Sequence, residues 1–513
     1  MSDEAGRPAF CERHYVALSL AVLALAACNL TFRLGSEVVT EWDESLYAIT
    51  AWEMRTTGHW IGTTFLGTLD YYNTKPPLNV WLIALAFKSF GASLLSLRLA
   101  SAAAAWSSIA IVQAWSRRTL GAEVALLSGI VLSTSFGFLY VHSGRSANTD
   151  ALFTLLIVLT AVTLWVGDKH PAAAVWLGPI AASAFLLRGM AVLMVIAIAL
   201  VVETWRARRG RRIRTRPLML ALLLFAVPAG GWILMRWQLD GWLFLGRLFG
   251  YDFIARSLTV IEDHPGTPLY YLNILQKQQF DWVLAGIAAL ALCPLPWSRI
   301  RTLFTFWRGD DVGRMVLGTW TAVALVVPTL MRTKLPWYLN TFYPAFAIGI
   351  AWILAHALFG AGSDGAARRR QAIAGAVFAI ALVGAESRLI WYSFHYRDLA
   401  HSGQGVLFAE RDTLRGVQVF GKDWNYGDIF VLEALLQGTH REAPSLEDFF
   451  FNSKSGDYLL SSQGVDRPEL LLVRSNSSHW LYRRVDPAQR LTRSADILGK
   501  KRDGGPADVG EIP

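Results

Sequence analysis

The sequence predicts a polytopic α-helical membrane protein with a soluble C-terminal domain. Hydrophobic residues make up 53% of the 513 residues and charged residues only 17%, whereas soluble domains carry about 25% charged residues. The chain contains 21 Trp, a residue enriched where a bilayer meets water. Its three cysteines form neither a CxxC motif nor a zinc-ligand pattern, which argues against a disulfide framework or zinc finger. A disordered chain and an ordinary soluble enzyme are excluded.

Apolar runs divide the first three quarters of the chain into spans. About 20 apolar residues cross the hydrocarbon core of a bilayer. We expect about eleven to thirteen transmembrane helices and place eleven at 14–31, 96–115, 121–141, 150–167, 172–187, 189–205, 217–238, 278–296, 314–331, 337–359 and 372–392. The first is not read as a signal peptide, because no small-residue cleavage site follows it. Residues 76–90 are short, begin at a double proline and contain Lys88, so we predict an interfacial helix.

Charge patterning orients these spans. With the N-terminus inside, eleven spans place most Arg-rich turns on the cytoplasmic side, as the positive-inside rule requires. The cytoplasmic turns are 117–118, 168–170, 206–216, 299–314 and 368–370, and all except 168–170 contain Arg clusters. A twelfth span at 76–90 would place every later Arg cluster on the extracytoplasmic side of the membrane. The net charge of +9 is therefore explained by membrane orientation, and no nucleic-acid partner is expected.

The outward-facing segments contain the unusual sequence. We expect residues 1–392 to form the membrane domain, with a first extracytoplasmic loop at 32–75 and a large one at 239–277. Residues 393–513 change in composition and alternate short β-like runs at 405–410, 416–420, 469–473 and 480–485 with a helical stretch near 429–437. These patterns predict a small extracytoplasmic α/β or α+β domain. The last dozen residues are rich in Gly, Pro and Asp, which predicts a disordered tail.

Two neighbouring carboxylates, Asp43 and Glu44, follow the first span, with Tyr47 one turn later. A carboxylate at the membrane boundary can act as a general base or orient a hydroxyl. The structural alternative is an N-cap, because acidic residues favour the start of the helix-like run that follows.

Lys75 lies in the same loop, just before Pro76 and Pro77. The prolines keep Lys75 out of the following helix, so an outward cation precedes the interfacial helix. It is well placed to bind an anion such as a lipid phosphate. The alternative is a lysine that reaches to lipid headgroups from the end of an apolar segment.

Two further outward turns carry cations against the local expectation. One contains Arg145 and ends at Asp150, and the other contains Arg332 and Lys334 and leads to Tyr338. An anionic substrate explains such cations, and an ion pair with Asp43 or Asp150 is the simpler alternative. Asp150 could also cap the apolar run that it opens. No Walker A, GxGxxG, GxSxG or HExxH motif is convincing.

The combined motifs resemble one family closely. They are Asp43-Glu44 with Tyr47, Tyr72 with Lys75-Pro76-Pro77-Leu78, the Arg145–Asp150 turn, and Thr333-Lys334-Leu335-Pro336-Trp337-Tyr338 leading to Pro344. Over residues 35–350 the chain is similar to the polytopic GT-C glycosyltransferases, in particular the aminoarabinose transferase and protein O-mannosyltransferase group. The resemblance implies a GT-C fold and inverting transfer of a sugar from a polyprenyl phosphate on the extracytoplasmic face.

The resemblance also implies roles for individual residues. Asp43 matches the residue that activates or orients the acceptor, with Glu44 beside it, and Asp150 matches a second cavity carboxylate. The residues expected near the donor phosphate are Lys75, Tyr72, Arg145, Arg188, Lys334 and Tyr338. Tyr47 and His264 are expected elsewhere in the cavity, since His264 falls where the family has a loop histidine.

Two departures from the family pattern bear on cofactors. Leu46 replaces the arginine that often precedes the tyrosine of the first motif. Thr74 replaces the acidic residue that commonly precedes the phosphate-binding lysine. A metal site in some relatives uses that acidic residue with the loop histidine, so we expect no bound metal, although a divalent metal stays open.

We therefore expect a glycosyltransferase of the cell inner membrane whose active site and C-terminal domain face the periplasm. Its partners are the bilayer, a polyprenyl-phosphate donor carrying a hexose or pentose, and a lipid, glycan or protein acceptor. Lipopolysaccharide modification and protein mannosylation are both compatible with this reading. The alternatives are a transporter or flippase of an anionic lipid-linked substrate and a non-catalytic assembly factor.

Overall fold

The computed structural model describes residues 10–486 except 213, 261–263, 296–297, 299–300, 302–304, 361–363 and 423. Contacts divide the chain into unit 1, Met1–Gly35 with Leu46–His395, and unit 2, Ser36–Ser45 with Tyr396–Pro513. The expected boundary at 392/393 therefore changes in two ways. The last long helix continues to His395, and the short segment 36–45 groups with the C-terminal residues. The expected disordered tail lies outside the described residues.

Unit 1 is helical. Its longer helices are α2 (Tyr15–Thr31), α3 (Asp43–Thr57, whose first turn belongs to unit 2), α4 (Leu78–Phe90), α5 (Leu94–Thr119), α6 (Ala122–Ser133), α8 (Asp150–Lys169), α9 (Leu177–Arg188), α10 (Val192–Arg208), α11 (Thr215–Asp240), α14 (Tyr270–Gln278), α15 (Phe280–Leu292), α17 (Val312–Leu330), α18 (Tyr343–Phe359) and α19 (Gly365–His395). Short helical segments connect them: α1 (Phe10–Arg13), η1 (Leu34–Ser36, whose last residue belongs to unit 2), α7 (Phe136–Tyr140), η2 (Pro171–Trp176), η3 (Gly189–Ala191), α12 (Trp242–Arg247), η4 (Leu248–Ala255), α13 (Arg256–Leu258), η5 (Phe306–Arg308) and η6 (Pro336–Leu339).

Seven helical segments in the described part of the chain are long and apolar enough to cross a membrane, namely Tyr15–Ser36, Leu94–Thr119, Asp150–Lys169, Pro171–Arg208, Thr215–Asp240, Val312–Leu330 and Gly365–His395. Pro171–Arg208 contains two of the spans expected from the sequence. The other expected spans match these segments or the shorter apolar helices α6, α15 and α18. The protein is thus a multi-span membrane protein.

Helix α4 has 13 residues, so it is about 20 Å long at 1.5 Å per residue. That length is short of the hydrocarbon core, which is about 30 Å thick. Its interfacial placement stays a prediction.

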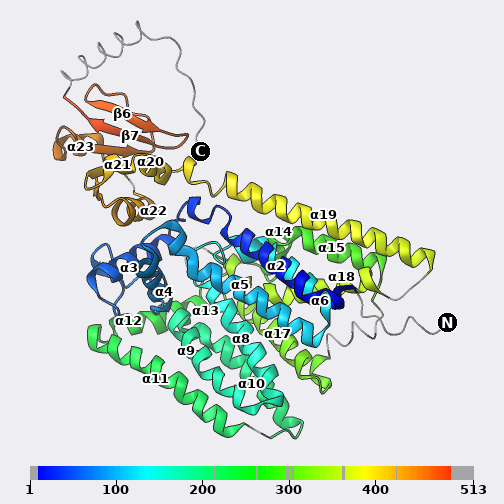
Figure 1. Cartoon of the computed structure of the whole chain (residues 1–513). Helices are drawn as coiled ribbons and strands as arrows, with labels where there is room; N and C mark the ends of the chain where they lie inside the picture. Colours follow the sequence, from blue (N-terminus) through cyan, green and yellow to red (C-terminus); the bar gives the residue numbers. More distant parts are fainter. Residues whose placement is uncertain are drawn as a thin grey trace. The chain divides into compact units, whose positions relative to one another are not determined.

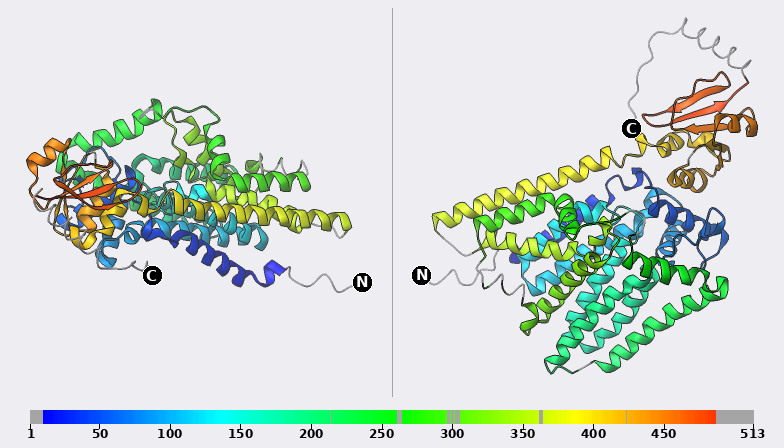
Figure 2. Two further views of the ribbon diagram at one scale, coloured as in Figure 1. Left: turned by 90° about the horizontal axis from the view of Figure 1, so that it is seen from above. Right: turned by 180° about the vertical axis from the view of Figure 1, so that it is seen from behind.

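The core of unit 1 forms where the long helices pack along a roughly common direction (Figures 1 and 2). Helix α6 packs against α2, α5 and α18, and α5 also packs against α8. Alanines at the α5 surface, such as Ala102 and Ala105, are buried, and small residues let helices approach closely in membranes. The packing brings together the helix ends from which the functional turns emerge.

The loops expected at 32–75 and 239–277 contain regular structure. After α3, strands β1 (Thr64–Phe65) and β2 (Thr68–Leu69) pair antiparallel around Leu66 and Gly67, which both have positive φ. A two-residue turn of this kind matches the twist of a hairpin. The larger loop is mostly helical, formed by α12, η4, α13 and the start of α14.

Unit 2 contains a five-stranded mixed sheet in the order β4-β3-β5-β7-β6. Its strands are β3 (Gln418–Gly421), β4 (Thr439–Glu442), β5 (Tyr458–Ser461), β6 (Leu470–Ser475) and β7 (Trp480–Arg484). β3 is parallel to both β4 and β5, with Val419 opposite His440 and Tyr458. β7 pairs antiparallel with β5 and β6. Helical segments accompany the sheet: η7 (Leu399–His401), α20 (Gly403–Ala409), α21 (Arg411–Leu414), α22 (Tyr426–Phe430), η8 (Val431–Leu435) and α23 (Leu446–Asn452).

The expected C-terminal α/β domain is therefore present, with one local error. Residues 405–410 were expected as a strand but lie largely in α20. The Ser402 side chain accepts a hydrogen bond from the Gly405 N–H at the start of this helix. A short apolar run has no periodicity that separates strand from helix, so the serine cap decides the outcome.

Candidate active site

Lys75 is held at the end of a tight turn in unit 1. Asp70 Oδ1 accepts the backbone N–H groups of Tyr72 at 2.8 Å and Asn73 at 3.1 Å, which is an Asx-type turn. Pro76 and Pro77 then delay the start of α4 until Leu78. The Lys75 ammonium lies 5.2 Å from the centre of the Tyr47 ring, a distance typical of a cation–π contact. Thus the structure brings Lys75 and Tyr47, which the sequence analysis selected separately, into contact.

Asp150 and Arg188 form an ion pair. Asp150 opens α8 and Arg188 ends α9, and the distance from Arg188 Nη1 to Asp150 Oδ1 is 2.6 Å. Asp150 is only 3% exposed. The residue preceding α8 is Thr149, so Asp150 is not the N-cap considered from the sequence. The pair joins two helix ends through a short, charge-assisted hydrogen bond.

The Asp150–Arg188 pair and Lys75 belong to one neighbourhood. Gly189 follows Arg188 with a φ of +54°, and a Cβ there would lie 3.8 Å from Pro76 Cδ and 2.8 Å from Leu248 Cδ1. Electrostatic interactions link Asp150 to Lys75 and His142, and Arg188 to Tyr47 and Tyr338. We call this set the anion cluster; it consists of Tyr47, Lys75, His142, Asp150, Arg188 and Tyr338.

His142 is the member of the anion cluster that the sequence analysis did not select. It has a φ of +53°, uncommon for a residue other than glycine, and its ring stacks on Trp337 with centroids 3.7 Å apart. The Asn340 side chain also donates to the Val141 carbonyl at 2.8 Å. The turn before Asp150 is therefore packed on the turn that carries Tyr338. A histidine opening a polar turn beside an apolar run was the available signal.

Arg145 has a role different from the one expected. Its guanidinium, 1% exposed, donates to the carbonyls of Asn29 and Phe32 at the end of α2 and lies 4.8 Å from the Tyr140 ring centre. A cation at a helix C-terminus satisfies carbonyls that lack intrahelical partners. These contacts indicate a structural cation rather than a donor-phosphate ligand.

Lys334 also caps a helix. Its ammonium donates to the carbonyls of Pro328, Thr329 and Met331 at the end of α17. Burial lowers the pKa of Lys334, and the nearby charge of Arg332 acts in the same direction. Neither the expected phosphate role nor an ion pair with Asp150 fits these contacts.

Asp43 and Glu44 lie in the part of α3 that belongs to unit 2. Helix α3 begins at Asp43, so both carboxylates favour the helix dipole. Glu44 is fully buried; it accepts the N–H and hydroxyl of Thr40, each at 2.8 Å, and lies 3.7 Å from Arg397 Nη2. Glu44 is therefore engaged in structural contacts, whereas Asp43 remains the candidate acceptor residue.

Two other expected residues lie at exposed positions. The Tyr72 side chain is 58% exposed. His264 is exposed, and its carbonyl accepts the Lys334 N–H at 3.0 Å. Among the described residues, no group of three or more His, Cys, Asp or Glu could hold a metal ion. Glu262 and Asp263, beside His264, lie outside the described residues.

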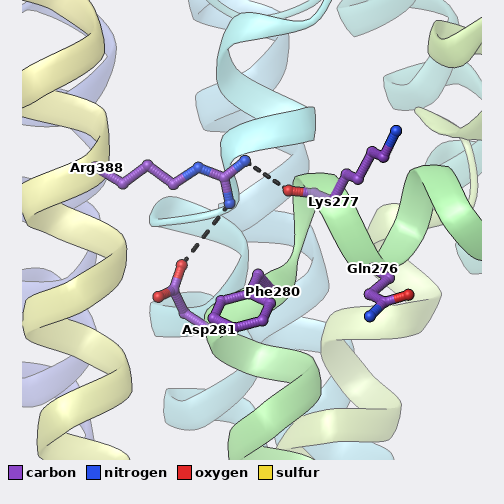
Figure 3. A pocket seen from close by; sticks show the side chains of 5 residues that line it. All are labelled: Gln276, Lys277, Phe280, Asp281 and Arg388. Carbon is purple, nitrogen blue, oxygen red and sulfur yellow. Dashed lines mark hydrogen bonds and ion pairs between the residues drawn. The ribbon is translucent and has the colours of Figure 1, made fainter.

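A pocket in unit 1 lies among residues of α14, α15 and α19 rather than at the anion cluster (Figure 3). Arg388 from α19 donates to the Lys277 carbonyl at 2.7 Å and lies 3.8 Å from Asp281. Arg388 thus joins α19 to the end of α14. Its charge is already engaged by a carboxylate and a helix end.

The anion cluster has the composition of a phosphate-binding site. Arg188 binds the Asp150 carboxylate, Lys75 interacts electrostatically with the same carboxylate, and Tyr47 and Tyr338 interact electrostatically with Arg188. In a site partly shielded from water, a fixed cation stabilises an anion more strongly than in bulk solvent. The arrangement suits an anion whose negative charge increases during a reaction.

Comparisons with known proteins agree with the fold and with the expected resemblance. Residues 74–233 match the family model described as dolichyl-phosphate-mannose-protein mannosyltransferase. The chain is 28% identical over 308 residues to an undecaprenyl phosphate-α-4-amino-4-deoxy-L-arabinose arabinosyl transferase of Pseudomonas fluorescens, covering 58% of this chain and 50% of the relative. It is 29% identical over 327 residues to the Pseudomonas aeruginosa transferase of that name, covering 62% and 55%. The matched region thus spans about half the length of these relatives.

Solved structures show the same architecture. The chain superimposes on ArnT from Cupriavidus metallidurans bound to undecaprenyl phosphate with a TM-score of 0.66 and 17% identity, covering 91% of this chain and 97% of ArnT. An oligosaccharyltransferase from Archaeoglobus fulgidus gives a TM-score of 0.51 and 13% identity, covering 88% and 69%. The protein therefore has the GT-C fold predicted from its sequence.

Proposed function

We propose that the protein is an inverting glycosyltransferase that moves a sugar from a polyprenyl-phosphate donor to a lipid acceptor. The observation that carries the proposal is the anion cluster, in which Lys75 and Arg188 share the neighbourhood of Asp150. The similarity to the arabinosyl transferases and to ArnT supports the same activity.

In this proposal Lys75 and Arg188 hold the donor phosphate. When the glycosidic bond breaks, the polyprenyl phosphate leaves as a phosphate monoester with one more negative charge than it had in the donor. Preorganised cations stabilise that developing charge without rearranging during the reaction. The Asp150 carboxylate already accepts a short hydrogen bond from Arg188, so we assign it the task of orienting Arg188 rather than that of a base.

Asp43 is our candidate for the residue that orients the acceptor. It opens α3 one helical turn before Tyr47, whose ring contacts Lys75. The acceptor oxygen attacks the anomeric carbon as the bond to the phosphate oxygen breaks, and the acceptor proton passes to Asp43. A single displacement of this kind inverts the configuration at the anomeric carbon.

The donor is proposed from the names of the relatives. The names give a pentosyl donor, undecaprenyl phosphate carrying 4-amino-4-deoxy-arabinose, as the first to test. The names give no acceptor, and we propose a lipid A-like glycolipid from the family resemblance of the sequence motifs. A hexosyl donor and a glycan or protein acceptor are the other outcomes of the test. We also propose that the reaction occurs on the periplasmic face of the inner membrane, in agreement with the charge pattern of the turns.

The test is transfer by the purified protein in detergent, followed by mass spectrometry of donor and acceptor lipids. Wild-type protein is expected to shift the acceptor mass by one sugar residue, and Lys75→Ala is expected to show no shift. Mass spectrometry of envelope lipids, glycans and proteins from cells with and without the protein identifies a different acceptor. The transporter alternative is tested with the protein reconstituted in vesicles. Movement of the unchanged donor across the vesicle membrane, with no acceptor modified, would support a transporter.

A further inference from the structure

The segment 36–45, which leads into Asp43, is held by C-terminal residues of unit 2. The Val38 N–H donates to the Arg397 carbonyl at 2.9 Å, and Glu37 and Asp398 form an antiparallel bridge. The Gln404 amide accepts from the Val39 N–H at 2.8 Å and donates to the Val39 carbonyl at 2.9 Å. With Gln404 only 3% exposed, this reciprocal pair mimics the pairing of a neighbouring strand.

Arg397 adds a buried ionic contact on the same segment. Its guanidinium lies 3.4 Å from Glu37 and 3.7 Å from Glu44, and both carboxylates are fully buried. Removing one member of a buried charged set leaves the others without compensation, which is strongly unfavourable. Arg397 therefore binds both ends of the segment, with Glu44 directly after Asp43.

The residue before Asp43 is held in an unusual conformation. Trp42 has a φ of +67°, which a bulky residue adopts only where the surrounding structure imposes it. Its ring meets the edge of Tyr426 with centroids 6.1 Å apart. The direction in which the chain enters α3 is therefore set by contacts inside unit 2.

We propose that unit 2 positions Asp43 for the transfer reaction, with Arg397 and Gln404 as the positioning residues. This inference rests on the proposed function, in which Asp43 orients the acceptor. Displacement of a catalytic group by about 1 Å can cost about 100-fold in rate, so a well-held segment matters more here than in an ordinary loop. In this proposal the C-terminal domain contributes to catalysis by positioning Asp43, without binding substrate itself.

The first measurement tests the hold itself, independently of substrate. Hydrogen exchange of the peptide covering residues 36–45 is compared in the full-length wild type, Gln404→Ala and Arg397→Met. Both variants are expected to exchange faster at Val38 and Val39. Arg484→Met is the matched control, because Arg484 binds the Phe450 and Ser453 carbonyls elsewhere in unit 2; it should leave this peptide unchanged.

The second measurement tests the action through Asp43, using the arabinose donor and lipid A. Gln404→Ala and Arg397→Met are expected to lower kcat about tenfold or more while the KM for the donor changes by less than about twofold, because unit 1 holds the donor. In an Asp43→Asn background the same changes should cost nothing further, since residues that act as a unit are not additive. Arg397→Lys should restore part of the rate.

The outcomes separate this inference from the proposed function. If Gln404→Ala accelerates exchange but keeps the wild-type kcat while Asp43→Asn is inactive, the positioning role is wrong and the glycosyltransferase assignment stands. A full rate in Asp43→Asn overturns the role of Asp43 and with it the positioning role. Independent, additive losses in the double variants also overturn the positioning role.

Discussion

Two pairs of cations occupy similar places in the sequence but different places in unit 1. Arg188 binds the buried Asp150 carboxylate, and Lys75 interacts with it electrostatically. Arg145 and Lys334 instead donate to backbone carbonyls at the ends of α2 and α17. All four residues lie in or next to the turns between apolar segments.

The difference shows what a cation in a membrane-protein turn can satisfy. A helix end leaves carbonyl groups without partners, and a nearby cation can satisfy them as fully as a substrate would. Arg188 and Lys75 differ from these two capping cations in facing a buried carboxylate instead of helix-end carbonyl groups. The groups that the fold places beside each cation therefore decide between capping and ligand binding.

The sharpest test of the comparison is Lys75→Ala. Loss of a cation that stabilises the leaving phosphate is expected to lower kcat about 100-fold or more, while the thermal unfolding temperature stays near that of wild type. Transfer assays and thermal unfolding in detergent measure the two effects. Lys88→Ala, on the exposed side of α4, is the control and should keep full activity; equal losses in both would show a surface-charge effect.

A smaller effect on activity is expected for Asp150→Asn. The amide still accepts a hydrogen bond from Arg188 but no longer compensates its charge, so Arg188 is held less firmly. We expect about a tenfold loss in kcat/KM, expressed mainly as a higher KM for the donor. A loss as complete as that of Lys75→Ala, with an altered pH profile, would return Asp150 to the role of a catalytic base.

The opposite pattern is expected for Arg145→Met and Lys334→Met. Each leaves buried carbonyl groups unsatisfied, which costs about 1–3 kcal/mol, so thermal unfolding should occur several degrees lower. The KM for the donor should remain at its wild-type value in the folded fraction. An increase in this KM without loss of stability would show that these cations contact the phosphate after all.

The smallest expected effect is on the pH dependence of stability, through the buried Asp428 carboxylate of unit 2 and its neighbour Glu41. Burial, with Glu41 adding to it, raises the pKa of Asp428 to about 7, while a hydrogen bond from the Gln404 backbone acts in the opposite direction. The folded state thus binds the proton more tightly than the unfolded state, and this stabilisation is lost as the pH rises through about 7.

Asp428→Asn should therefore raise the unfolding temperature by a few degrees at pH 8.5 and by less at pH 5, which lies between the ordinary pKa of 3.8 and the folded pKa of about 7. His479, whose pKa is lowered by burial, is another ionisable residue near Gly403, which Asp428 also approaches. His479→Gln is therefore the control that separates the titration of His479 from that of Asp428. Thermal unfolding at the two pH values decides, and an equal shift at both would assign the effect to packing.

The sequence was informative where a pattern had one physical solution. Apolar runs gave the spans, and the double proline after Lys75 kept that residue in a turn before α4. The family motifs selected Tyr47, Asp150, Arg188 and Tyr338, which the structure brings together around Lys75. These residues lie at helix ends whose positions follow from hydrophobic patterning.

Other features depend on contacts that the sequence does not display. Arg145 finds the end of α2 more than a hundred positions earlier in the chain, and no local pattern announces this pairing. Glu44 is buried against Arg397, which lies in the distant C-terminal segment. His142 was identified as a member of the anion cluster only from the structure, where its ring stacks on Trp337.

Gly189 shows how the grip on an anion can depend on a residue with no side chain. Its positive φ strains any residue with a side chain, a methyl group there would also displace the Leu248 side chain, and it directly follows Arg188. A Gly189→Ala variant would retain every ionisable residue of the protein, and we expect it to misalign the guanidinium. A variant of this kind keeps all the charged residues, so charge conservation alone would not reveal its effect. The backbone conformation at Gly189 has to be considered as well.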